Sequence, residues 1–343
     1  MHTRIPLNTL AIGFGLAGLA EVWGVAGDTF GFPPLIAQLF WLATAIAWIW
    51  LIVAHTVRGA RSRDTLLSQL RHPVQGPIAA LAPVTGMLLA GDLLRFSQPA
   101  GTVLFLIFVA AAALFSGWLI GTWLQGGFAI ESVHGGYLLP TVASGLVGAD
   151  VAAQARLTEL GWALFGVGLL FWAVMTVLVV FRLAFRPALP DPLVPTMAIL
   201  VAPPAVAGLA WFSLTGVHYS VIGAMLLGLL VLLVLVQLAL IPRYRRLPFS
   251  LGFWSFTFSA AAVLADAMLW LQLAAFPGWQ FAAALLLIIA TVLIGGIGIR
   301  SLLAVRSRRL EGRAERVLVE ADASVADPDS AMVPDTTRVL VNS

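Results

Sequence analysis

One run of this chain limits its possible folds more than any other. Leu193–Pro242 carries no Asp, Glu, Lys or Arg. A helix needs about 20 apolar residues to cross the hydrocarbon core of a bilayer, so the run is long enough for two spans, divided at Thr215–His218. The whole chain is 60% hydrophobic and 10% charged, whereas a soluble domain carries about 25% charged residues. A soluble fold would lack polar surface, and the sequence therefore predicts a membrane protein.

Similar runs predict ten transmembrane helices in all. Besides the two spans in Leu193–Pro242, they are expected at Leu7–Ala26, Leu35–Val57, Val74–Gly91, Ala100–Leu124, Tyr137–Gly148, Leu160–Phe181, Phe249–Leu273 and Gln280–Leu303. The fifth is short, and a polar segment at 150–159 follows it. We expect residues 1–305 to form one membrane domain and the polar residues 306–343 to form a disordered tail.

The basic residues predict the orientation of the spans. All 19 are arginines, and with ten spans all but Arg95 and Arg156 fall on one side of the membrane. Because loops rich in Lys and Arg stay in the cytoplasm, we expect both termini to be cytoplasmic in an inner-membrane protein. The sequence pI of about 10.1 then reflects topology, and no nucleic-acid partner is expected.

The odd-numbered and even-numbered spans differ in composition. Odd spans begin near residues 7, 74, 137, 194 and 250 and contain Pro83, Pro140, Pro203 and Pro204, whereas even spans are smooth apolar runs. Proline frees a backbone carbonyl, and within a membrane this is tolerated where the helix lines a cavity. The pattern predicts an all-α protein of five helical hairpins around a central pore, with the odd spans innermost.

The stretch Leu247–Asp266 has the composition expected of a helix that carries a gate. It places phenylalanines among small and hydroxyl residues and ends in a carboxylate. A ring can change rotamer at modest cost, so Phe258 is either a steric gate or an ordinary core aromatic.

Four separated motifs resemble the tellurite-resistance/dicarboxylate transporter (TehA) family, which includes the slow anion channels of plant guard cells. The motifs are His72-Pro-Val-Gln, Arg182 with Phe185-Arg-Pro, Leu200-Val-Ala-Pro-Pro-Ala-Val-Ala, and Leu247-Pro-Phe-Ser-Leu-Gly-Phe-Trp-Ser-Phe-Thr-Phe. The resemblance covers about residues 5–305 and implies a homotrimer with an anion pore in each subunit, plugged by Phe258. Ser259 stands where the plant channels have proline, which leaves the local bend of this helix open.

The predicted pore lining combines kink residues with small and hydroxyl side chains. It comprises Gly15, Pro83, Pro140, Pro203, Pro204, Ser255, Ser259 and Ala262. Selectivity would come from pore width, hydroxyl groups, helix-end dipoles and arginines at the inner mouth.

Two carboxylates fall inside odd spans, where ionisable groups are costly and usually functional. Glu21 and Asp266 lie at similar depth in the outer half, since a helix rises 1.5 Å per residue. One hypothesis is a pH-sensing outer vestibule in which the two share a proton. The alternative is that each faces the outer interface or binds a nearby donor.

The sequence leaves three functions open. The first is a gated channel for small anions; the second is a proton-coupled carrier of C4-dicarboxylates or of toxic compounds such as tellurite. The third is a membrane scaffold or sensor that acts through the polar tail. The chain has no cysteine, no Gly-x-Ser-x-Gly motif and no phosphate-binding loop, so we expect no enzyme, metal site or cofactor.

Overall fold

A computed structural model describes residues 4–326 of the chain. Within this range the structure is helical and contains no β-strand. Its α-helices are α1 (Ala11–Phe30), α2 (Leu35–Ala60), α3 (Leu66–Leu70), α4 (Leu81–Leu93), α5 (Gln98–Leu124), α6 (Ser144–Gln154), α7 (Thr158–Phe185), α8 (Ala202–Thr215), α9 (Val221–Tyr244), α10 (Ser255–Ala274) and α11 (Trp279–Ala326). The chain divides into two compact units, Met1–Ile297 and Gly298–Ser343.

Ten helical segments of the described residues are long and apolar enough to cross a membrane, which confirms the predicted all-α membrane fold. They alternate between buried and exposed, as the proline pattern predicted. In the most apolar part of each odd span 44–89% of the residues are buried, against 11–28% in the even spans. The odd spans therefore form the inside of the bundle, and the even spans cover them.

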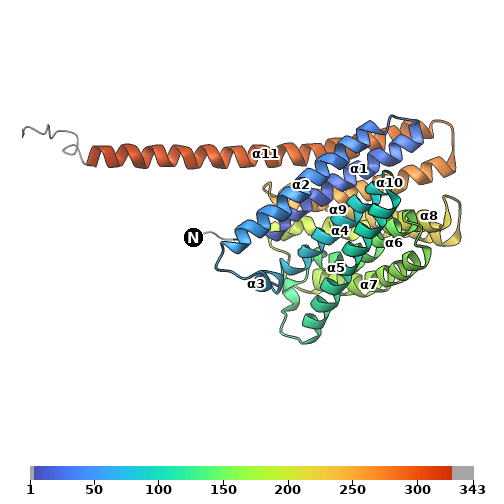
Figure 1. The fold of residues 1–343 in the computed structure, drawn as a ribbon, viewed down its shortest axis with the longest axis horizontal. Helices are drawn as coiled ribbons and strands as arrows, with labels where there is room; N and C mark the ends of the chain where they lie inside the picture. The colour runs from blue at the N-terminus through green and yellow to red at the C-terminus, as the bar shows by residue number, and fades with distance from the viewer. Residues whose placement is uncertain (1–3, 327–343) are drawn as a thin grey trace, which may run out of the picture. The chain divides into compact units, whose positions relative to one another are not determined.

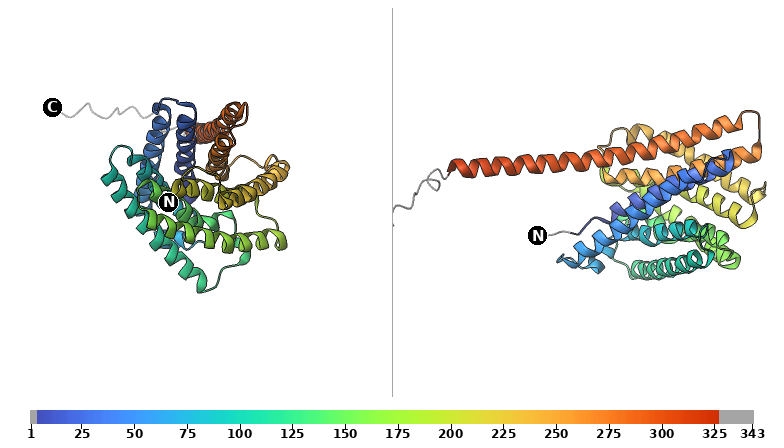
Figure 2. Two further views of the ribbon diagram at one scale, coloured as in Figure 1. Left: turned by 90° about the vertical axis from the view of Figure 1, so that its right-hand side faces the viewer. Right: turned by 45° about the horizontal axis from the view of Figure 1, so that its top comes forward.

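The five odd spans contact one another in a closed ring. Helix α1 contacts α4 and α10, α6 contacts α4 and α8, and α8 contacts α10. Each of α2, α5, α7 and α9 packs on the odd helix before it in the chain (Figure 1). In the left view of Figure 2 the colours follow one another around the bundle, from blue through green and yellow to orange beside blue. Consecutive hairpins are thus neighbours in space.

Every odd span opens with an irregular segment before its α-helix. Four open with 3₁₀ segments at Leu7–Leu10, Gly76–Ala80, Asp191–Val201 and Leu251–Trp254, and the fifth combines a 3₁₀ segment, Gly135–Leu138, with a π-helical turn, Leu139–Ala143. Short 3₁₀ and π segments within a helix often mark functional positions. All five irregular segments begin at the same end of the bundle, and the cavity described next lies there.

Two boundaries differ from those predicted. The fifth span extends to Gln154, so Asp150, which we expected in a polar loop, lies in the last turns of α6. Helix α11 continues through residues 306–326 of the expected tail. Residues 327–343 lie outside the described part of the chain, so the disorder expected there stays a prediction.

Candidate functional site

A cavity of about 230 Å³ opens among the irregular beginnings of the five odd spans, and we call it the apolar cavity. Its lining is mostly aliphatic and aromatic, and residues of all five odd spans contribute to it. The polar side chains in its wall are those of Asn8, Gln75, His134, Thr196, Ser255 and Ser259. They are all neutral when the histidine is neutral, so this cavity offers hydrogen bonds and no side-chain charge.

A second cavity, of about 370 Å³, lies further along the same five helices, and we call it the acidic cavity. Its charged lining residues are Glu21, Asp28, Asp92, Arg95 and Asp150. Four carboxyl groups face one arginine there, and Asp92 lies 4.0 Å from the Arg95 Nε. If all are ionised, the cavity is net negative and opposes the entry of anions.

Two stacked phenyl rings line the apolar cavity at its end nearer to the acidic cavity. The ring centroids of Phe14 and Phe258 are 3.7 Å apart and their planes differ by 18°. Phe14 is the last residue of α1 to line the apolar cavity, and Glu21, seven residues later, lines the acidic one. Seven residues are about 10 Å of helix. The ring pair therefore marks the level at which the apolar cavity ends, and the acidic cavity begins further along the same helices.

Glycines on α1 let it approach α10 closely enough for the rings to stack. A Cβ added at Gly15 would lie 2.1 Å from the Thr257 Oγ1, and one at Gly18 would lie 2.9 Å from the Ala261 Cβ. Both separations are shorter than van der Waals contact. Gly15 is thus a packing residue of the α1–α10 contact, and it does not line either cavity.

The two carboxylates predicted as a pair have different surroundings. Glu21 lines the acidic cavity, as does Asp150, which accepts hydrogen bonds from the Ser213 hydroxyl and from the Gln154 amide. Asp266 is 1% exposed, lines neither cavity, and packs against Gly208, where a Cβ would lie 2.4 Å from its Oδ1. Asp150 therefore lines the acidic cavity together with Glu21, the position that was expected for Asp266.

The other predicted lining residues divide into two groups. Ser255, Ser259 and Pro203 line the apolar cavity together with Phe258. Ala262 and Pro204 are buried among the helices and line neither cavity, and Pro83 faces a groove shared with Trp48 and Phe108.

Pro140 lines neither cavity, and its main-chain carbonyl contacts a neighbouring helix. Its carbonyl accepts a hydrogen bond from the Ser116 hydroxyl of α5, so an even span binds a carbonyl in the π-helical turn. The neighbouring Leu138, Leu139, Val142 and Ala143 provide the cavity wall.

His134 joins the third and fifth spans at the cavity wall. Its Nδ1 accepts a hydrogen bond from the Gly136 amide at 3.0 Å. Its Nε2 lies 3.0 Å from the Val74 carbonyl oxygen, and because that oxygen can only accept, Nε2 must be the donor. One nitrogen accepts and the other donates, so the ring is neutral. Burial lowers the pKa of His134 to about 4, which agrees with that tautomer.

Sequence reasoning missed two residues of this arrangement. Phe14 stands between Gly13 and Gly15, and a lone ring between glycines in an inner span was a usable signal. Asp150 was excluded by ending the fifth span at Gly148, six residues before the helix ends at Gln154.

Comparison with known proteins places the chain in a family. The family model described as "Voltage-dependent anion channel" (SLAC1) matches residues 4–301. The chain is 25% identical over 260 residues to the tellurite resistance protein TehA homolog of Haemophilus influenzae, covering 76% of this chain and 79% of that protein. It is 24% identical over 270 residues to the guard cell S-type anion channel SLAC1 of Arabidopsis thaliana, covering 74% of this chain and 48% of that one.

The S-type anion channel SLAH2 of the same plant is also 24% identical over 270 residues, covering 76% of this chain and 51% of that protein. The chain thus spans about half the length of the two plant channels. The family match includes the first nine spans, most of the tenth and both cavities. This multi-pass membrane protein therefore belongs to the SLAC1/TehA family of anion channels and transporters.

Proposed function

We propose that the chain is a gated channel for small anions, in which the acidic and apolar cavities are two halves of one pathway. Phe258 closes the pathway between them and opens it by moving away from Phe14. The arginine-rich end of the bundle is the cytoplasmic end, and the acidic cavity faces the opposite side.

The ring stack is the observation that carries this proposal. Phe258 is 6% exposed and pairs with Phe14 at the end of the apolar cavity. Stacked aromatic pairs contribute about 0.5–1.5 kcal/mol beyond simple burial. An energy of that size is enough to hold a gate closed most of the time and small enough for thermal opening.

Anion flux into proteoliposomes tests the gate. Phe258→Ala is expected to raise chloride and nitrate flux about three- to tenfold, the gain that a stacking energy of this size allows, and to leave it non-saturating. Phe256→Ala is the matched control, since Phe256 lies two residues away and packs against Tyr244 and Phe253, away from both cavities. Equal flux through wild type and Phe258→Ala, with both proteins correctly folded, would contradict the gate.

A second function is supported by the acidic cavity. Carboxyl groups in a membrane protein that bind and release protons are typical of proton-coupled carriers, and Glu21 and Asp150 line that cavity. A carrier of C4-dicarboxylates or of tellurite-like compounds would load its substrate when these groups are protonated. One relative bears the name of a tellurite resistance protein.

Uptake kinetics separate the two functions. A carrier saturates with substrate and concentrates it only when a pH gradient is imposed. A channel gives a flux that grows with concentration and follows the membrane potential. Saturable uptake driven by the pH gradient, and unaffected by Phe258→Ala, would favour the carrier.

We further propose that the protein works as a homotrimer in the inner membrane. The even spans leave long apolar faces exposed, for example along α9, and part of these faces would be covered by neighbouring subunits. Native mass spectrometry in detergent would give the number of subunits, and a monomer active at all dilutions would overturn the proposal.

A further inference from the structure

Among residues 4–306, Arg182, at the C-terminal end of α7, is the most deeply buried arginine. It is 2% exposed. Its Nε and Nη2 donate to the Glu131 carbonyl at 3.4 and 3.2 Å, whereas its Nη1 has no hydrogen-bond partner among the described residues. A buried charge is costly unless an opposite charge compensates it. The acceptor that holds Arg182 is a neutral carbonyl, so its positive charge is not compensated by a hydrogen-bonded carboxylate.

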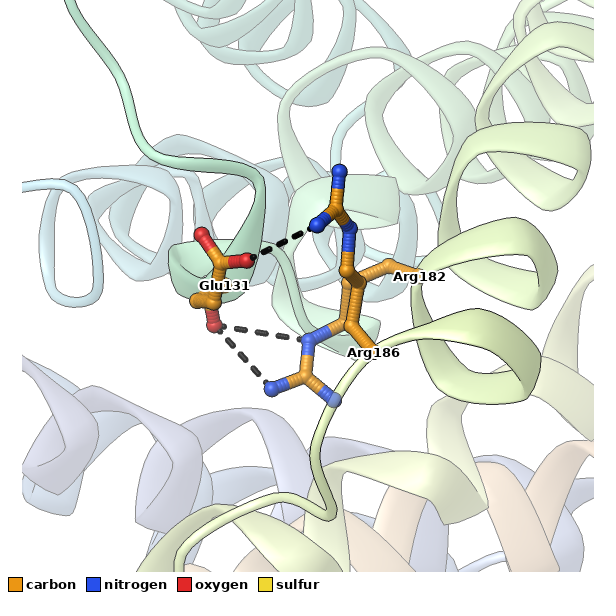
Figure 3. A network of polar contacts seen from close by, with 3 residues as sticks. All are labelled: Glu131, Arg182 and Arg186. Atoms are coloured by element: carbon orange, nitrogen blue, oxygen red, sulfur yellow. Dashed lines mark hydrogen bonds and ion pairs between the residues drawn. The ribbon is translucent and has the colours of Figure 1, made fainter.

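The carboxylate of the same glutamate is directed to a different arginine. The Glu131 Oε1 lies 3.7 Å from the Nη1 of Arg186, and both side chains are about half exposed, at 48% and 47%. Figure 3 shows both arginines on the same side of Glu131, with the guanidinium of Arg186 at its carboxylate and that of Arg182 at its main-chain oxygen. The exposed arginine is compensated by the carboxylate, and no ion pair involving Arg182 forms in the described part of the chain.

The buried charge lies close behind the wall of the apolar cavity. Arg182 holds the segment that leads into His134, and its charge acts on that ring in the same direction as burial, lowering the pKa of His134. His134 is neutral and lines the apolar cavity. The lining therefore carries no charge at this end of the cavity, whereas Arg182 is a buried positive charge next to the segment that leads into it.

We infer that Arg182 is the fixed positive charge that selects anions over cations at the arginine-rich end of the pathway, acting through space. This inference rests on the proposed anion channel. Water and salt screen exposed arginines within about 10 Å at 0.1 M salt and about 3 Å at 1 M. A charge excluded from solvent is screened much less. The effect of Arg182 on selectivity therefore persists at high salt, whereas the effect of the exposed Arg186 is lost.

The test uses planar bilayers and the open parent Phe258→Ala. The permeability ratio of chloride to potassium is taken from reversal potentials in KCl gradients centred near 0.1 M and near 1 M. Arg182→Gln is expected to lower this ratio about threefold or more at both concentrations. Arg186→Gln, the matched loss of charge on the same helix end, is expected to lower it at 0.1 M only. Arg182→Lys, which keeps the charge and loses the paired donation to Glu131, is expected to retain the ratio.

Each outcome of this test supports or overturns either the proposed channel or the role of Arg182. A parent without anion current overturns the proposed channel and the inference with it. A conducting parent whose selectivity is unchanged by Arg182→Gln overturns the inference alone. If Arg182→Lys and Arg182→Gln lose selectivity and thermal stability together, the residue is a structural clamp for the 130–133 segment and the inference is wrong.

Discussion

The phenyl rings of Phe14 and Phe258 lie face to face, with centroids 3.7 Å apart, at the end of the apolar cavity that is nearer to the acidic cavity. They come from the first and ninth spans, which are neighbours only because the ring of inner helices closes. Neither ring can leave the stack without changing the surroundings of the other. The proposed gate is therefore a property of the pair.

Coupling between the two rings can be measured directly. Phe14→Ala removes the surface against which Phe258 stacks, so we expect it to raise anion flux, by less than Phe258→Ala does. The flux of the double variant should not exceed that of Phe258→Ala, because the effects of substitutions at two residues in contact are not additive. Anion fluxes of the wild type, the two single variants and the double variant in proteoliposomes form a double-mutant cycle. If the increase in the double variant equals the product of the two single increases, the rings act separately.

The close contact of α1 with α10 predicts a stability effect at Gly15. Its Cβ position overlaps Thr257, so Gly15→Ala forces the helices apart and should cost about 1–3 kcal/mol, as overpacking does. Gly117→Ala is the control, because no atom lies within 4 Å of that Cβ position. Melting temperatures in detergent should fall for the first variant only. An unchanged melting temperature for Gly15→Ala would mean that α1 moves aside without cost.

The acidic cavity predicts which carboxylates affect permeation. In a Phe258→Ala background, and at a pH high enough to ionise both carboxyl groups, Glu21→Gln and Asp150→Asn should each raise chloride flux about threefold, since each then removes a negative charge from the cavity wall. Asp266→Asn should leave flux unchanged, because Asp266 packs against Gly208 outside both cavities. A larger effect of Asp266→Asn than of Asp150→Asn would restore the pairing of Glu21 with Asp266.

A hydrogen bond between an even and an odd span should be measurable at Ser116. Ser116→Ala leaves the Pro140 carbonyl without its donor from α5 and should cost about 1–3 kcal/mol. Thr122→Val, on the same helix, removes a hydroxyl that bonds only to Trp118 of its own helix and should cost less. Thermal unfolding in detergent compares the two. Equal losses would show that the bond between helices adds nothing.

How far the sequence could predict the site is seen on α10. Ser255, Phe258 and Ser259 line the apolar cavity together, because a helix fixes the relative directions of neighbouring side chains. Ala262, one turn further along the same face, is buried between helices. Spacing along one helix gave the face correctly, but it could not say where the cavity ends.

The sequence by itself determined the ten spans, since hydrophobic length and turn residues are local properties. The prediction that Leu193–Pro242 breaks at Thr215–His218 is confirmed, as α8 ends at Thr215 and α9 begins at Val221. The proline-bearing odd spans also proved to be the buried ones.

Only the tertiary structure decided which side chains meet. The rotation of each helix about its axis depends on the shapes of its neighbours, such as the space left by Gly15 and Gly208. That rotation turns Asp150 toward the cavity of Glu21, packs Asp266 against α8 and brings Phe14 onto Phe258. Contacts between residues far apart in the chain leave no period in the sequence, so hydropathy and spacing could not reveal them.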